Sequence, residues 1–134
     1  MKYLLVFLCL LGCNYNKNKQ TVSICSGNTF YKMTEKIRLD DSTKILSFKG
    51  KFLKTEGIFR YSFEDVALYP SSVNNSEKAL WLNLMTSKIF TDSFYSNLDG
   101  KKVILIGKVN TERKGHFNGY LASLDSVLCI EEVQ

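Results

Sequence analysis

Apolar and polar residues alternate along most of the chain after residue 43, in runs that turn-forming residues separate. Alternation with a period of two is typical of a β-strand that covers a core with one face. In the first run, Phe48 and Phe52 fall on one side, and Lys49 and Lys51 fall on the other. The pattern predicts five strands, over residues 44–55, 58–69, 78–85, 101–110 and 120–131.

Glycine, proline and polar residues predict the connections between these strands. Glu56-Gly57 is the expected turn between the first two strands, and Pro70, the only proline, ends the second. Residues 86–98 lose the period of two, and their apolar residues fall on one side of a short helix. Residues 111–119 contain two glycines and predict a polar loop between the last two strands.

The run over residues 101–110 is the strongest strand signal in the chain. Val103 and Leu105 fall on one face, while Ile104 and Ile106 fall on the other. A strand that is apolar on both sides is expected to be covered on both sides.

The order strand, strand, strand, short helix, strand, strand resembles the OB-fold, a five-stranded Greek-key barrel. Gly50 in F-K-G-K-F and Gly107 in L-I-G-K-V are expected in mid-strand, where a small barrel bends sharply. The run L-D-G-K-K-V-I-L-I-G-K-V is similar to the fourth strand of many OB-fold proteins.

The resemblance covers about residues 44–131 and implies a mainly β, OB-like barrel with one short helix between strands three and four. An SH3-like barrel or a β-sandwich fragment would show similar strands. The expected domain, residues 22–134, also includes an N-terminal extension.

The chain opens with Lys2 and an apolar block that ends on Leu10-Leu11-Gly12-Cys13. This block is shorter than the ~20 residues of a membrane span and fits the ~7–15 apolar residues of a signal peptide. The ending resembles the lipobox of bacterial lipoproteins. In that family the cysteine carries diacylglycerol, the chain is cut before the cysteine, and the amine that this cut exposes is acylated with chains such as palmitate. The resemblance implies that residues 1–12 are a signal peptide and that Cys13 is the lipidation site. The alternatives are a plain secretory signal with a chance cysteine, or a short buried apolar segment.

Residues 13–21 are polar apart from Tyr15 and cannot bury a core, so they predict a lipidated tether. The lipid anchor would attach the protein to the membrane. No acidic residue follows Cys13 directly, and the periplasmic face of the outer membrane is the expected location.

The charge pattern indicates which classes of binding partner are expected. The formal net charge is +5, without a long basic run, which suits a soluble mixed-charge surface. A weak attraction to anionic head groups or glycans is the other interpretation. Nucleic acid is not an expected partner outside the cytoplasm.

Cys25 and Cys129 remain after Cys9 is removed and Cys13 is lipidated. An oxidising compartment permits a disulfide, which would close a loop of roughly 100 residues. Two buried thiols are the alternative, and the sequence leaves both open.

Catalytic signatures are few. The sequence contains one histidine, His116, and no G-x-S-x-G motif or paired-cysteine metal spacing. Glu64 and Asp65 are adjacent and would point to opposite faces of a strand. We therefore expect no enzyme activity, no metal and no cofactor.

The OB-fold resemblance implies a ligand site on strands two and three and the loops beside them. The candidate ligand-binding residues on the strands are Arg60, Tyr61, Phe63, Trp81 and Asn83, and those in the 111–119 loop are Arg113, Lys114 and His116. Alternatively, Phe63 and Trp81 belong to the core, and His116 is an exposed or turn-capping residue of a two-glycine loop.

Together these features predict a membrane-anchored bacterial envelope lipoprotein that acts as a non-catalytic binding module for an envelope protein or glycan. The alternative is an inhibitor or immunity lipoprotein that occludes an enzyme or toxin in the periplasm.

Overall fold

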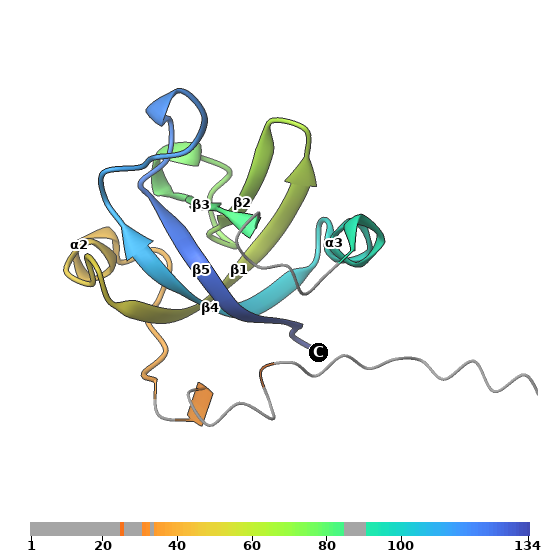
Figure 1. Cartoon of the computed structure of the whole chain (residues 1–134), viewed down its shortest axis with the longest axis horizontal. Coiled ribbons are helices and arrows are strands. Elements are labelled where there is room, and N and C mark those ends of the chain that lie inside the picture. The colour runs from red at the N-terminus through yellow and green to blue at the C-terminus, as the bar shows by residue number, and fades with distance from the viewer. Residues whose placement is uncertain (1–24, 26–30, 33, 85–90) are drawn as a thin grey trace, which may run out of the picture.

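The computed structural model describes residues 25, 31–32, 34–84 and 91–134 (Figure 1). The predicted signal peptide, lipobox and tether lie outside these residues. The elements are α2 (Ser42–Leu46), β1 (Phe52–Ser62), β2 (Asp65–Tyr69), a 3₁₀ turn (Ser76–Lys78), β3 (Leu80–Leu82), α3 (Asp92–Leu98), β4 (Lys102–Asn110), a second 3₁₀ turn (His116–Asn118) and β5 (Ala122–Glu132).

The five strands form a closed barrel in the order β1-β2-β3-β5-β4. The pairing of β3 with β5 is parallel, and the other neighbours are antiparallel. Helix α3 lies between β3 and β4 in the chain. The prediction of a mainly β, five-stranded OB-like barrel with a short helix at this place is confirmed.

The bounds of the first two strands were predicted wrongly. Residues 42–46 form α2, whose N-cap Asp41 accepts a hydrogen bond from the Lys44 backbone N–H at 2.9 Å. This cap sets a helical turn, and Ile45 then points into the core. Gly50 follows with φ 74°, a conformation that ends the turn and suits glycine, so it does not lie in a strand.

Gly57 lies inside β1 and not in a turn. A Cβ at this position would collide with the Tyr69 carbonyl oxygen and would approach Leu39 Cδ2 to 2.8 Å. The glycine therefore permits close approach between β1, β2 and the segment before α2. The turn between β1 and β2 falls at Phe63-Glu64 instead.

The prediction that β4 is covered on both faces is confirmed. Leu105 belongs to the barrel interior, while Ile106 is fully buried in a second cluster on the outside of the barrel. That outer cluster contains Cys25 and Cys129, which form a disulfide with their Cα atoms 5.1 Å apart. The bridge attaches the N-terminal extension to β5, beside β4.

Gly107 lies within β4, as predicted, where the pairing with β5 shifts register. A Cβ there would lie 2.9 Å from Leu124 Cβ, an interior side chain. The glycine lets the strand bend tightly over the core at this irregularity.

Candidate functional site

A groove of about 720 Å³ lies along β3 and β5, between the β1–β2 turn and the β4–β5 loop (residues 111–121). The turn and the loop project from the same end of the barrel, at the top of Figure 1, away from the described part of the N-terminal extension. Seven of the eight candidate ligand residues line this groove, and these are Tyr61, Phe63, Trp81, Asn83, Arg113, Lys114 and His116.

Ring contacts and hydrogen bonds hold Tyr61 in place at the edge of the groove. Its ring centroid is 5.4 Å from that of Tyr95 on α3 and 6.1 Å from that of Phe59. Its backbone N–H donates to Asp99 Oδ1 at 2.8 Å, and its hydroxyl donates to Asp92 Oδ1 at 2.7 Å. The bond to Asp92 raises the pKa of the Tyr61 phenol above its ordinary value, so the phenol stays protonated.

Trp81 is half-buried on the outward face of β3, while its neighbours Leu80 and Leu82 point into the barrel interior. The ring meets the ring of Tyr120 edge-on at 5.3 Å between centroids. Gly115, with φ 68°, brings the backbone of the β4–β5 loop against the indole, because a Cβ there would lie 2.7 Å from two ring carbons. Trp81 is therefore held by the loop and does not belong to the interior core.

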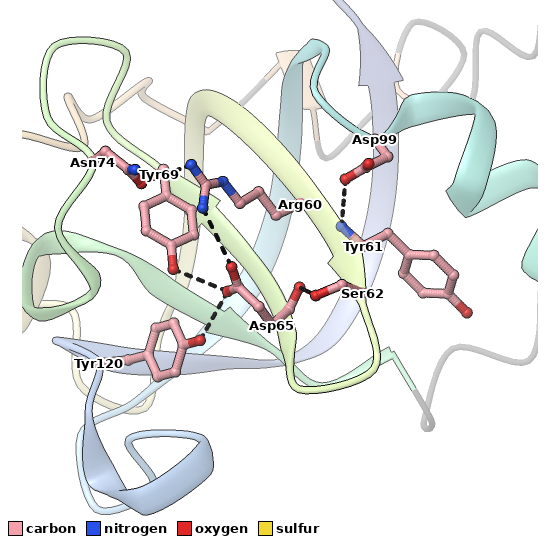
Figure 2. Close-up of polar contacts among 8 residues, drawn as sticks. All are labelled: Arg60, Tyr61, Ser62, Asp65, Tyr69, Asn74, Asp99 and Tyr120. Carbon is pink, nitrogen blue, oxygen red and sulfur yellow. Dashed lines mark hydrogen bonds and ion pairs between the residues drawn. The ribbon is translucent and has the colours of Figure 1, made fainter.

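Arg60 lies outside the groove, in a polar cluster on the outer face of β1 and β2 (Figure 2). Asp65 is the centre of this cluster: its Oδ1 accepts hydrogen bonds from the hydroxyls of Tyr69 at 2.9 Å and Tyr120 at 2.8 Å. The Arg60 guanidinium is 3.6 Å from Asp65 Oδ2, lies over the Tyr69 ring and donates to Asn74 at 2.7 Å. We refer to these five residues as the Asp65 cluster.

The Asp65 cluster joins the two segments that border the groove. Asp65 begins β2 directly after the β1–β2 turn, and Tyr120 lies near the end of the β4–β5 loop, two residues before β5. Burial first, and then the hydrogen bond to Asp65, raise the pKa of Tyr120 and keep its hydroxyl a donor. The same two causes raise the pKa of Tyr69. The cluster thus positions the turn and the loop relative to each other.

Two phenylalanines project into solvent here, Phe63 in the lining of the groove and Phe117 beside it. Phe63 in the β1–β2 turn is 98% exposed, so the alternative that placed it in the core is wrong. Phe117 in the β4–β5 loop is 90% exposed and has φ 53°, a backbone conformation that phenylalanine rarely adopts. His116 is exposed beside it, and the two ring centroids are 4.1 Å apart.

The charges in the groove are mixed. The charged side chains that line it are Asp92, Glu112, Asp125, Arg113 and Lys114. Glu112 forms an exposed ion pair with Lys49 at 3.0 Å. Asp125 accepts hydrogen bonds from the Asn110 amide at 2.9 Å and from the Ser123 hydroxyl at 3.3 Å.

The sequence analysis missed Asp92 and Asp125 as groove residues. The signal for Asp125 was its place with Ser123 at alternate polar positions of the last strand. The parallel pairing of β3 with β5 sets Ser123 opposite Trp81, and that pairing cannot be seen in the sequence.

In the part of the chain that the structure describes, no group of three or more His, Cys, Asp or Glu side chains could hold a metal ion. The side chains that line the groove include aromatic rings, carboxylates and amides.

Comparison with known protein families, curated proteins and solved structures finds no match to this chain. None of the helices formed by the described residues is long and apolar enough to cross a membrane. The assignment to the OB-like class rests on the strand order and pairing.

Proposed function

We propose that this chain is a membrane-anchored envelope lipoprotein whose OB-like barrel is a non-catalytic binding module. The observation that carries the proposal is the groove, because it brings together seven of the eight residues that the fold resemblance implied as ligand-binding candidates. OB-folds bind oligomeric ligands with the same surface. A non-catalytic role is supported by the sequence, which has a single histidine, no G-x-S-x-G motif and no paired-cysteine metal spacing.

In this proposal the lipid on Cys13 holds the module at the periplasmic face of the outer membrane. The anchor confines the barrel to a thin layer and raises its effective concentration for an envelope ligand. The location is supported by the lipobox resemblance of Leu10-Leu11-Gly12-Cys13.

Site-specific photocrosslinking in intact cells tests the binding function. A photoreactive phenylalanine analogue at His116, an exposed groove residue, should give a discrete adduct. The same analogue at Thr43, an exposed residue of α2, is the control and should give none. Equal labelling from both positions, or from neither, would remove the groove as the binding site.

The lipid anchor has its own test. We expect Cys13→Ala to abolish labelling by a fatty-acid analogue and to release the protein from the membrane fraction, because the acylated thiol is lost. Cys9→Ala, within the expected signal peptide, is the matched control and should leave labelling unchanged. Persistent labelling of Cys13→Ala would contradict the lipobox assignment.

The second candidate function is an inhibitor or immunity lipoprotein that occludes an incoming enzyme or toxin. The exposed side chains of Phe63 and Phe117 favour it, because large protruding aromatic residues are frequent anchors of protein interfaces. A single dominant protein captured from His116, and lost in a Phe63→Ser/Phe117→Ser variant, would favour this candidate over the first.

A further inference from the structure

We propose that the groove binds a neutral, hydroxyl-rich oligosaccharide. The inference rests on the proposed binding function of the groove and names the ligand class. Three features carry it: two immobilised aromatic rings, two carboxylates with neutral partners, and a nearly balanced charge.

The rings of Tyr61 and Trp81 are suited to stack on the C–H faces of sugar rings. Both are half-buried, so each retains an accessible part on the groove. Tyr61 is held by Tyr95 and by its bonds to Asp92 and Asp99, and Trp81 is held by the loop backbone and Tyr120. Because the rings are ordered before binding, little conformational entropy is lost when a ligand stacks on them.

The carboxylates of Asp92 and Asp125 are suited to accept hydrogen bonds from sugar hydroxyls. Asp92 accepts from the Tyr61 hydroxyl, and Asp125 accepts from Asn110 and Ser123, all of them neutral donors. Neither carboxylate forms an ion pair with any residue in the described ranges. An ionised carboxylate offers roughly four acceptor sites, so both retain capacity for adjacent hydroxyl groups.

The charge of the groove disfavours strongly charged ligands of either sign. The lining contains three carboxylates and two cations, Arg113 and Lys114. A polyanion such as single-stranded nucleic acid needs an excess of cations along its track, and a cationic peptide would meet Arg113 and Lys114. A neutral oligosaccharide avoids both costs and still gains the hydrogen bonds to the carboxylates.

The size of the groove fits an oligomer. A volume of about 720 Å³ is within the range of pockets that take a drug-sized ligand, roughly 300–1,000 Å³.

The test is retention of the full lipidated chain, purified in detergent, on immobilised oligosaccharides. The probes are neutral N-acetylhexosamine and hexose oligomers, uronate oligomers, deacetylated glucosamine oligomers and a single-stranded oligonucleotide. We expect retention by a neutral oligomer that persists at high salt. Asp125→Asn should weaken it about ten-fold, because a charge-assisted acceptor is lost.

Asp40→Asn is the matched control, since Asp40 is an exposed carboxylate that pairs with Arg38 away from the groove. It should leave retention unchanged. Thermal unfolding verifies that each variant folds. If Asp125→Asn does not fold, Asp92→Asn makes the same chemical change at an exposed groove position and takes its place.

Other outcomes separate the two proposals. Retention only by uronate oligomers or the oligonucleotide, with a steep loss at high salt, would overturn the ligand class. No retention by any probe, together with a protein adduct from His116, would overturn the saccharide inference and leave the binding function standing. No retention and no adduct would overturn both.

Discussion

Asp65→Ala should lower the free energy of unfolding by about 2–3 kcal/mol, because it leaves two tyrosine hydroxyls without their acceptor. Tyr69 and Tyr120 are both largely buried, so water replaces the lost carboxylate only in part. The Arg60 guanidinium also loses its ion pair. The Asp65 side chain is itself 24% exposed, which keeps the expected loss below that of a fully buried charge. Urea unfolding of the two proteins measures the difference.

Three variants separate this effect from a general loss of surface charge. Tyr69→Phe and Tyr120→Phe should each cost about 1 kcal/mol, since each removes one hydrogen bond to Asp65. Asp40→Ala removes an exposed carboxylate and should change the free energy of unfolding by no more than about 0.5 kcal/mol. If Asp65→Ala behaves like Asp40→Ala, the cluster does not hold the barrel together.

The Asp65 cluster also predicts the response to alkaline pH. The pKa values of Tyr69 and Tyr120 are raised in the folded protein, first by burial and then by the bond to Asp65. The folded state therefore keeps protons that the unfolded chain loses near pH ~10. The stabilisation from these phenols is complete below that pH and is lost as the pH rises through the folded pKa values. In the Tyr69→Phe/Tyr120→Phe variant this alkaline loss should be smaller.

Loss of the Cys25–Cys129 disulfide should lower the free energy of unfolding by about 3–5 kcal/mol. The bridge spans 104 positions in sequence, so its removal frees a very long loop in the unfolded chain. It also fastens the N-terminal extension over the fully buried Ile106 side chain. The test is urea unfolding of the wild-type protein with and without a thiol reductant, compared with the Cys25→Ser/Cys129→Ser variant.

The double variant is the control for the reductant, because it has no bridge between β5 and the extension to break. We expect its unfolding midpoint to be the same with and without reductant, and to match that of the reduced wild-type protein. A wild-type midpoint that does not move on reduction would show that the bridge contributes nothing to stability.

Much of the β architecture follows from local patterns, and the errors fall where local patterns compete. The segment around Phe48 alternates like a strand, yet the Asp41 cap starts a helix over residues 42–46, and a turn that ends at Gly50 with positive φ follows it. Gly57 looks like a turn residue, but only contact with Tyr69 and Leu39 explains why a glycine stands in mid-strand. For β4 the apolar residues on both faces left no competing pattern, and its bounds agree within a residue.

The order of the five strands, the short helix between β3 and β4, the two covered faces of β4 and seven of the seventeen groove residues could be predicted from the sequence alone. Each of these depends on periodicity or on neighbours a few positions apart, which the chain records directly. Only the tertiary structure decided that Asp92 and Asp125 join Tyr61 and Trp81, and that Arg60 turns away to Asp65. The physical reason is that barrel closure joins residues that are distant in sequence. It does so through the parallel pairing of β3 with β5 and the packing of α3 beside β1. The direction of each side chain then depends on the register between the paired strands.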